Sequence, residues 1–266
     1  MNIPRWTSRL SEPRASEFKA SLADILLRGC YPEIASRPRV DRRLWCGSYL
    51  ATYLERDVRN LANVGDLGRF ERFLKLCAIR TGQLLNLSDL ARDTGVSVPT
   101  AKRWISILET GDQVFLRPSY YGSIGKRLIR SPKIYFTDTG LATYLLGLHD
   151  RDALLGSPSY GALFETLVVT DVLKRSLHEG LMPPMYYVRT RDGLEVDLAL
   201  EIGQKLILIE IKSAMTVYSK HAASLVRLKE DLGDRVKAAY LLSAARGSFP
   251  ISKGISNLNW LDALAT

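Results

Sequence analysis

The sequence has few cysteines and histidines and lacks long apolar runs. Of its 266 residues, three are Cys and three are His. An odd number of widely spaced cysteines, at positions 30, 46 and 77, predicts reduced thiols rather than disulfides or a zinc site. No apolar run reaches the roughly 18 residues of a membrane span, and the N-terminus lacks the apolar stretch of a signal peptide. We therefore expect a cytoplasmic protein that does not bind membranes.

The sequence also lacks the Gly-x-x-x-x-Gly-Lys-Ser/Thr loop that holds nucleotide phosphates. The stretch Gly122-Ser-Ile-Gly-Lys-Arg has the wrong spacing, and Arg127 stands where Ser or Thr is required. We therefore expect neither ATP as a cofactor nor ATP hydrolysis by this chain.

Acidic residues are scarce in the first half of the chain. Residues 1–150 hold 23 Lys/Arg and 15 Asp/Glu, a balance of +8, whereas residues 151–266 hold 14 and 13, a balance of +1, which together give the net +9. A basic half next to a nearly neutral one indicates a polyanionic partner for the first half. The alternative is an ordinary basic surface that water solvates.

The chain is expected to fold as α/β (α+β overall), in three regions. Residues 1–45 form a helical tail, with a helix over 17–27; residues 46–150 form a helical domain that ends in a hairpin; residues 151–266 alternate helix and strand. The Gly156-Ser-Pro-Ser segment is the best candidate for a domain boundary.

The middle region predicts a winged helix-turn-helix. The expected elements are helices over 70–79, 87–93 and 98–109 and extended segments over 114–116 and 133–136. Ser88 is a candidate cap of the second helix, and Ser97 caps the third, with Pro99 in its first turn. The linker over 120–127 is basic, aromatic and contains Gly, as expected of a wing.

The third helix of this region presents the residues expected to contact nucleic acid. Ala101, Ile105 and Leu108 form its buried stripe, and Trp104 is a core residue rather than a base-stacking one. Contacts to DNA are expected from the other side of this helix and from the wing. The predicted nucleic-acid-binding residues are Thr100, Lys102, Arg103, Lys126, Arg127 and Arg130, and Ser106 also points outward. Winged helices also serve as protein–protein modules, so a protein partner or a homo-oligomer remains open.

The last region predicts the order helix, strand, strand, strand, helix, strand. The expected helices cover 160–178 and 221–232, and the expected strands cover 185–188, 194–201, 205–211 and 238–242. Because side chains alternate along a strand, Glu195 and Asp197 share one face, opposite Leu194, Val196, Leu198 and Leu200. Glu210 and Lys212 lie together on the next, almost wholly apolar strand. Charged groups there lose hydration, and a divalent metal with oxygen ligands would compensate them.

This order of elements and acids resembles the restriction-endonuclease-like PD-(D/E)xK nuclease fold. The matching residues are Glu165 on the first helix, Asp197 on the second strand and Glu210-Ile-Lys212 on the third. The resemblance implies that Asp197, Glu210 and the Ile211 carbonyl bind Mg²⁺ or Mn²⁺. Glu165 would complete the metal's shell or hold a bound water, and Lys212 would activate the attacking water. Glu195 lies on the site face, where it either supports the site or is a surface acid. Without the resemblance, Glu165 would be a solvated helix acid.

Roughly residues 25–215 resemble, more specifically, the C-terminal half of a family of bacterial and archaeal AAA-type ATPases whose C-terminal domain is uncharacterised. The resembling stretches are Tyr49-Leu-Ala-Thr-Tyr-Leu-Glu-Arg-Asp57, Arg80-Thr-Gly-Gln83, Ser97-Val-Pro-Thr-Ala-Lys-Arg-Trp104, Ser131-Pro-Lys-Ile-Tyr-Phe-Thr-Asp-Thr-Gly140, Gly161-Ala-Leu-Phe-Glu165 and Gly193-Leu-Glu-Val-Asp197. Relatives usually begin with a nucleotide-binding module that is absent here, so residues 1–45 are expected to be the tail of that module.

Two functions follow as expectations. The first is a DNA-binding protein with a nuclease-fold domain acting as a Mg²⁺-dependent endonuclease. The second is a non-catalytic interaction or regulatory module, in which Asp197, Glu210 and Lys212 form a structural ion pair across adjacent strands.

Overall fold

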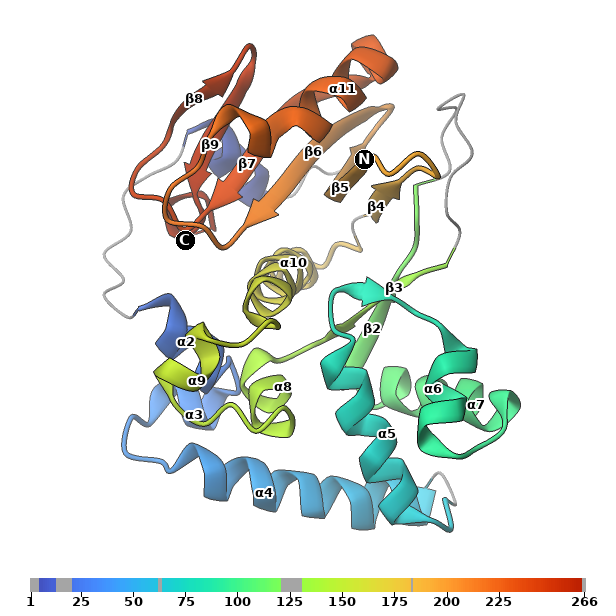
Figure 1. Ribbon diagram of the computed structural model, residues 1–266. Helices are drawn as coiled ribbons and strands as arrows, with labels where there is room; N and C mark the ends of the chain where they lie inside the picture. Colours follow the sequence, from blue (N-terminus) through green and yellow to red (C-terminus); the bar gives the residue numbers. More distant parts are fainter. Residues whose placement is uncertain (1–4, 13–20, 62–63, 121–130, 183, 265–266) are drawn as a thin grey trace. The chain divides into compact units, whose positions relative to one another are not determined.

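The computed structural model describes residues 5–12, 21–61, 64–120, 131–182 and 184–264. The chain forms two compact units (Figure 1). The helical unit comprises Ala20–Leu116 and Pro132–Leu167, and the sheet unit comprises Met1–Lys19, Arg117–Ser131 and Val168–Thr266. The predicted mixed α/β fold class is confirmed. The three-part domain division follows sequence regions rather than contacts, and it stays a prediction.

Nine helical segments precede residue 156 in the described part of the helical unit. They are α2 (Leu22–Arg28), α3 (Pro32–Ser36), α4 (Arg42–Thr52), the π-helix η2 (Tyr53–Leu61), α5 (Leu67–Ile79), α6 (Leu87–Thr94), α7 (Val98–Thr110), α8 (Thr139–Leu145) and α9 (Arg151–Leu155). The helix α10 (Tyr160–His178) begins in this unit and continues into the sheet unit. The predicted helix over 17–27 is described only from Leu22 onward.

The winged-helix topology predicted for the middle region is present. Along the chain run α5, β1 (Gln83–Leu84), α6, α7, β2 (Val114–Arg117) and β3 (Lys133–Phe136), and the sheet order is β1-β3-β2. Two-residue β1 was not foreseen, because so short a strand carries no alternation. Wing residues Lys126, Arg127 and Arg130 lie outside the described residues.

Side-chain caps set the starts of the two helices that form the helix-turn-helix. Ser97 caps α7 as predicted, with its Oγ accepting from the Thr100 N–H at 3.2 Å. The cap predicted for α6 is wrong: Asn86, not Ser88, fills that position, and its Oδ1 accepts from the N–H groups of Ser88 and Asp89. Ser88 lies two residues after the cap position, inside the helix, and its own N–H is one of the groups that Asn86 caps.

The core of the winged helix forms around Trp104. Its ring meets Phe70 and Phe73 edge-on, with centroids 5.2 and 5.3 Å away. The predicted stripe on α7 is buried: Ala101, Ile105 and Leu108 each expose 3% or less of their surface. Aromatic contacts of this kind confirm that Trp104 is a core residue.

A close approach of two backbones joins the end of α2 to the start of α8. The Asp138 carboxylate caps α8 by accepting from Leu141 N–H at 3.0 Å and also accepts from Cys30 N–H at 2.6 Å. A Cβ on Gly140 would lie 2.5 Å from the Arg28 carbonyl oxygen, and Gly29 has φ +70°. These positions therefore require glycine for steric reasons.

The sheet unit contains a mixed six-stranded sheet in the order β4-β5-β6-β7-β9-β8. The strands are β4 (Met185–Arg189), β5 (Glu195–Ile202), β6 (Lys205–Lys212), β7 (Val236–Ser243), β8 (Phe249–Ser252) and β9 (Ile255–Asn259). The first three pair antiparallel, and β6 pairs parallel with β7. The predicted order is therefore present as α10, β4, β5, β6, α11, β7. The strands β8 and β9 and the helix α12 (Trp260–Leu264) were not predicted from the sequence.

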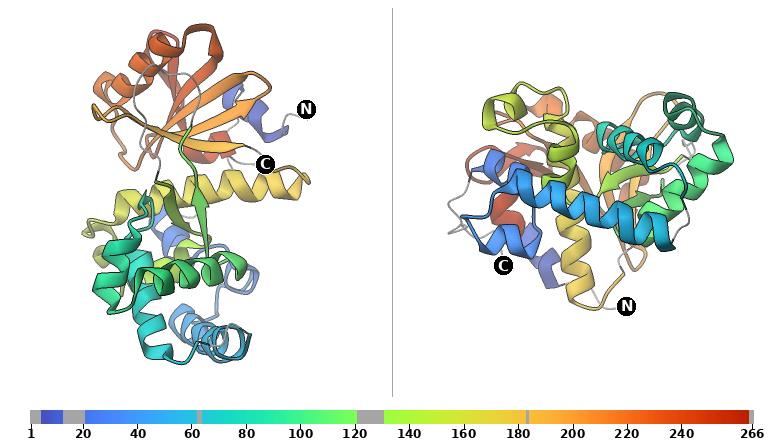
Figure 2. Two further views of the ribbon diagram at one scale, coloured as in Figure 1. Left: turned by 90° about the vertical axis from the view of Figure 1, so that its right-hand side faces the viewer. Right: turned by 90° about the horizontal axis from the view of Figure 1, so that it is seen from below.

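The helix α11 (Ala223–Leu232) packs on β5, β6 and β7, preceded by a 3-10 turn, η3 (Ser219–Ala222). The ribbon views of Figure 1 and Figure 2 show this helix alongside the strands of the sheet. Leu225 and Leu228 of α11 join a buried cluster that includes Leu208 of β6. The N-terminal helices η1 (Arg5–Thr7) and α1 (Ser8–Ser11) belong to this unit, and buried Trp6 donates from Nε1 to Ser176 Oγ at 3.1 Å.

The outer edge of β4 is covered by residues 118–120. Ser119 bridges Tyr187 in parallel, and Tyr120 N–H donates to the Tyr187 carbonyl at 2.8 Å. Tyr187 N–H donates in turn to the Pro118 carbonyl at 3.2 Å. An open strand edge invites pairing with other chains, so this segment protects the sheet.

Candidate functional site

The strand that carries Asp197 contains a β-bulge at that residue. Tyr186 pairs with Ala199 and Val188 pairs with Val196, so two steps along β4 match three along β5. The extra residue lies at Asp197–Leu198. Strict alternation was therefore a wrong expectation here: Val196 and Ala199, three positions apart, both join the cluster under α11. Bulges redirect side chains and are frequent beside active sites.

The bulge leaves Asp197 hydrogen-bonded to the neighbouring strand. Its Oδ2 accepts from the backbone N–H of Ile211 at 2.8 Å, and the residue is 7% exposed. The bond fixes the carboxylate beside the Glu-x-Lys segment at the end of β6. The structure thus brings together three of the predicted residues, Asp197, Glu210 and Ile211.

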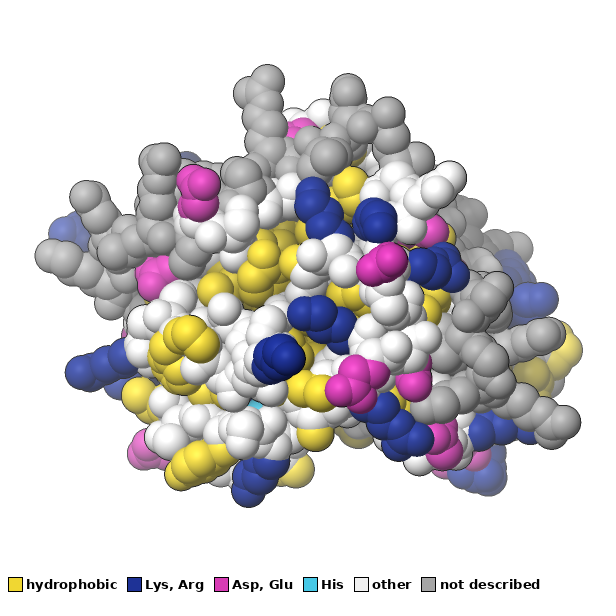
Figure 3. All heavy atoms as spheres, turned by 90° about the horizontal axis from the view of Figure 1, so that it is seen from above, with side chains coloured by type: hydrophobic (Ala, Val, Ile, Leu, Met, Phe, Trp, Pro, Cys, Tyr) yellow, Lys and Arg dark blue, Asp and Glu magenta, His cyan; other side chains and the backbone are white. Residues whose placement is uncertain are grey.

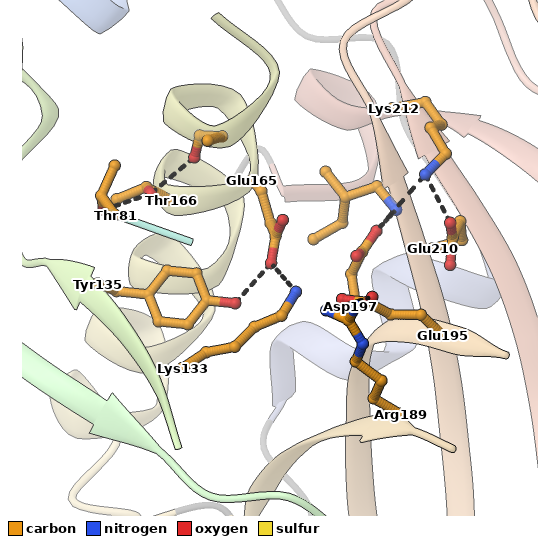
Figure 4. Close-up of polar contacts among 12 residues, drawn as sticks. Thr81, Lys133, Tyr135, Glu165, Thr166, Arg189, Glu195, Asp197, Glu210 and Lys212 are labelled. Atoms are coloured by element: carbon orange, nitrogen blue, oxygen red, sulfur yellow. Dashed lines mark hydrogen bonds and ion pairs between the residues drawn. The ribbon is translucent and has the colours of Figure 1, made fainter. Parts of the chain in front are cut away.

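Lys212 lies against both acids (Figure 4). Its Nζ donates to Glu210 Oε1 at 2.6 Å and lies 4.0 Å from Asp197 Oδ2. The side chains of the two acids are 9% exposed, whereas that of Lys212 is 37% exposed. The lysine therefore offers its ammonium to solvent while its carboxylate partners stay buried.

Glu195 was predicted to face the same site. The structure pairs it with Arg189 of β4, with 3.3 Å between Arg189 Nη1 and Glu195 Oε2. Both side chains are about one-third exposed, so the pair contributes little to stability.

Glu165 lies on α10 in the helical unit, where its partners are two residues of β3. Its Oε1 accepts from Tyr135 Oη at 2.5 Å and from Lys133 Nζ at 3.1 Å (Figure 4). The Lys133 and Glu165 side chains are 4% and 14% exposed, so Glu165 is not a solvated helix acid. Neither partner was predicted from the sequence, although a lysine in the apolar strand 133–136 was a usable signal.

The next residue on α10 makes a separate contact beside this network. Thr166 Oγ1 lies 2.9 Å from Thr81 Oγ1, which accepts from Phe136 N–H. Gly82, with φ +76°, lies where a Cβ would be 3.6 Å from Glu165 Oε2. The Arg80-Thr-Gly-Gln motif therefore contacts the part of α10 that carries Glu165.

The predicted nucleic-acid residues on α7 face outward. Lys102, Arg103 and Ser106 are exposed, and Thr100 is half-buried with its Oγ1 2.8 Å from Ser97 Oγ. The helix therefore presents a short basic surface at the position of a recognition helix.

The described residues contain no group of three or more His, Cys, Asp or Glu side chains placed to hold a metal ion. Asp197 and Glu210 are therefore a pair of acids, and a metal there would need backbone or water oxygens as further ligands. Two protein carboxylates suit Mg²⁺, which keeps several waters. Within the same described ranges, no helix is long and apolar enough to cross a membrane.

Comparison with known proteins places the chain in a family. Residues 19–152, about half of the chain, match the model of a domain of unknown function, DUF8612. Residues 160–261 match a second one, DUF4143. The two matches end and begin on either side of the segment Gly156-Ser-Pro-Ser.

Two mycobacterial proteins are similar to the chain. The uncharacterized proteins Mb2031c of Mycobacterium bovis and Rv2008c of Mycobacterium tuberculosis are each 37% identical to it over 210 residues, which is 78% of this chain and 46% of the relative. The chain thus spans about half the length of these curated relatives. With a family model matching half of its residues, the chain belongs to the DUF8612 family and carries a DUF4143 domain after it.

Proposed function

We propose that this chain binds DNA and that its sheet unit hydrolyses phosphodiester bonds in a Mg²⁺-dependent reaction. One observation carries the proposal: bulged β5 holds Asp197 beside Glu210 and Lys212 at the end of β6. The order of elements along the chain, α10, β4, β5, β6, α11 and β7, is the order on which the resemblance to PD-(D/E)xK nucleases rests.

The chemistry of the donor set fits a magnesium ion. The Asp197 and Glu210 carboxylates and the Ile211 carbonyl are oxygen ligands, which Mg²⁺ prefers. The two carboxylates carry one negative charge more than Lys212 offsets, and both are buried. A bound divalent ion would favour hydroxide formation from water and neutralise the scissile phosphate.

The side chains themselves supply positioning. Ile211 N–H holds the Asp197 carboxylate, and Glu210 holds the Lys212 ammonium at the edge of the buried pair. An ammonium fixed there would orient the attacking water and stabilise charge that develops on the phosphate. The role predicted for Glu165 stays a prediction.

The winged helix supports DNA as the substrate. Its α7 exposes Lys102 and Arg103, and the chain carries a net charge of +9. Phosphate contacts by such residues give affinity that falls steeply with salt.

The test is cleavage of plasmid and branched DNA with Mg²⁺ or Mn²⁺. Asp197→Ala and Lys212→Ala should abolish cutting, whereas the matched control Glu201→Gln, at the other end of β5, should retain it. Cutting by Asp197→Ala, or no cutting by the parent protein despite DNA binding, would contradict the proposal.

One observation favours the second candidate, a non-catalytic interaction module. Lys212 lies 2.6 Å from Glu210 and 4.0 Å from Asp197, as in a structural ion-pair network. This candidate predicts no cleavage with any metal. It also predicts a stable complex with a protein partner, which sedimentation of the chain mixed with that purified partner would detect.

The resemblance to AAA-type ATPases adds a limit to the proposal. The proposed DNA cleavage does not include ATP hydrolysis by this chain, because the sequence lacks the phosphate-binding loop. ATP turnover by the purified chain would contradict that limit.

A further inference from the structure

A second candidate site lies in the sheet unit, in a pocket of about 660 Å³. Four of its lining residues are lysines from four different parts of the chain: Lys205 at the start of β6, Lys229 on α11, Lys237 on β7, and Lys253 in the turn between β8 and β9. Figure 3 views the molecule from the side on which α11 lies in Figure 1, where Lys and Arg side chains, interspersed with Asp and Glu, lie around exposed apolar ones.

The pocket is separate from the acid pair. Lys205 and Lys212 begin and end the eight-residue strand β6. At about 3.3 Å per residue, the two ends of this strand are roughly 23 Å apart. The pocket therefore cannot be part of the site around Asp197.

Two of the lysines are held in place by backbone carbonyls. Lys205 Nζ donates to the Asp234 carbonyl, and Lys229 Nζ donates to the Gly254 carbonyl at 3.0 Å. Gly254 makes room for Lys229, because a Cβ there would lie 2.6 Å from Nζ. An ammonium has three N–H donors and one carbonyl takes one of them, so each lysine keeps donors for a ligand.

The charge and lining of the pocket define the ligand class. Four ammonium groups face two carboxylates, Glu230 and Asp234, so the lining sums to +2. Val226 and Val236 add an apolar surface. Lysine is a common ligand of phosphate, and the volume lies in the range of small-molecule sites, about 300–1,000 Å³.

We propose that this pocket binds a phosphomonoester, with the phosphate on the lysines and the organic group on the two valines. A free mononucleotide and the 5′-phosphorylated end of a nucleic acid strand carry the same group. The proposal is independent of catalysis at Asp197.

Calorimetric titration of the whole chain tests the proposal with inorganic phosphate, AMP, and a short oligonucleotide with or without a 5′-phosphate. Saturable binding is expected for the phosphate-bearing ligands. Binding of AMP that is tighter than that of inorganic phosphate would identify a free nucleotide as the source. Binding of the 5′-phosphorylated oligonucleotide that is tighter than that of its unphosphorylated counterpart would identify a strand end, because the two share every contact to the DNA backbone.

Single-residue variants distinguish binding at this pocket from nonspecific attraction by the positive charge of the protein. Lys205→Gln and Lys229→Gln should each weaken binding about tenfold, the effect of losing one charge-assisted hydrogen bond. Lys220→Gln, an exposed lysine of the same unit outside the pocket, is the matched control. Gly254→Ala keeps every charge but displaces Lys229, so it should also weaken binding, with circular dichroism confirming that the variant is folded.

No saturable binding of any phosphate-bearing ligand would overturn the proposal. Equal weakening by Lys220→Gln and Lys229→Gln would overturn it as well, because the lysines would then act only through overall charge. Binding that persists in Asp197→Ala is expected, so loss of cleavage leaves this proposal standing.

Discussion

The carboxylate of Asp197 accepts a hydrogen bond from the backbone N–H of Ile211 on the adjacent strand, with 2.8 Å between Oδ2 and N. The contact joins an acid at a bulge to the residue whose carbonyl is a predicted metal ligand. Asp197 therefore has a structural role that is distinct from any catalytic one, and variants at this position must separate the two.

Substitution of Asp197 by Ala and by Asn should separate stability from metal binding. Asp197→Ala removes the acceptor of a buried N–H and should lower the free energy of unfolding by roughly 1–3 kcal/mol. Asp197→Asn keeps an acceptor oxygen and should cost less, while still losing a negative ligand. Mn²⁺ should therefore raise the melting temperature of the parent but of neither variant. If Mn²⁺ raised the melting temperature of Asp197→Asn as much as that of the parent, Asp197 would not be a metal ligand.

The buried pair Lys133–Glu165 should show strong energetic coupling. Its N–O distance is 3.1 Å, and its side chains are 4% and 14% exposed. Lys133→Met or Glu165→Leu alone should cost about 3–5 kcal/mol, because each leaves the other charge buried. The double variant should be more stable than the sum of the two losses implies, as urea denaturation would show. Strict additivity would mean that the two groups do not interact.

Tyr135→Phe offers a smaller test of the same network. It removes the hydroxyl that donates to Glu165 Oε1 and leaves the lysine pair intact. A loss of about 1–2 kcal/mol is expected for a hydrogen bond to a charged group. The control Tyr144→Phe, outside this network, should change stability less, and the reverse order would contradict the assignment.

Gly140→Ala should destabilise the helical unit. The added Cβ would lie 2.5 Å from the Arg28 carbonyl oxygen, so the backbones of α2 and α8 would have to separate. Overpacking of this kind costs about 1–3 kcal/mol. Gly65→Ala is the control, because no atom lies within 4 Å of its added Cβ. Thermal denaturation should show a lower midpoint for Gly140→Ala alone.

The pKa of His221 should depend on the positive charge of Lys212, and this dependence can be measured without any substrate. Burial, then Lys220 and Lys212, lower the pKa of His221 below its ordinary value of 6.5. Because the folded state disfavours the imidazolium, this contribution to stability is present above pH 6.5 and lost as the pH falls below it. Lys212→Ala should raise the pKa of His221 in an NMR titration, and Lys220→Ala should raise it by more. No change in either variant would contradict the electrostatic assignment.

The sequence predicted elements where local signals are strong. Ser97 and Pro99 mark the start of α7, the alternation of apolar residues up to Asp197 marks β5, and a nearly continuous apolar run marks β6. The strands β8 and β9 were not predicted, because Pro250 and Gly254 interrupt their pattern and they become strands only by pairing, β9 with β7 and β8 with β9. Asn86 was overlooked as a cap because its neighbour Ser88 is an equally good cap residue by type.

The candidate site was predictable in identity but not in geometry. The spacing of Asp197, Glu210 and Lys212 follows from the resemblance. The bulge beside Asp197 arises only from pairing with β4, and the partners of Glu165 lie 30 or more residues away in sequence. The lysines of the pocket are separated in the same way, so no local pattern could reveal them.

The route of the chain through its two units has a consequence for fragments. The chain passes from one unit to the other at residues 19/20, 116/117, 131/132 and 167/168, four times in all. A fragment that starts at Val168 would lack Pro118–Tyr120 and would expose the edge of β4 to self-association. A single cut after Leu167 would keep every residue of the helical unit in one fragment, but it would divide the residues of the sheet unit between two fragments. The sheet unit, unlike the helical unit, therefore depends on the continuity of the chain.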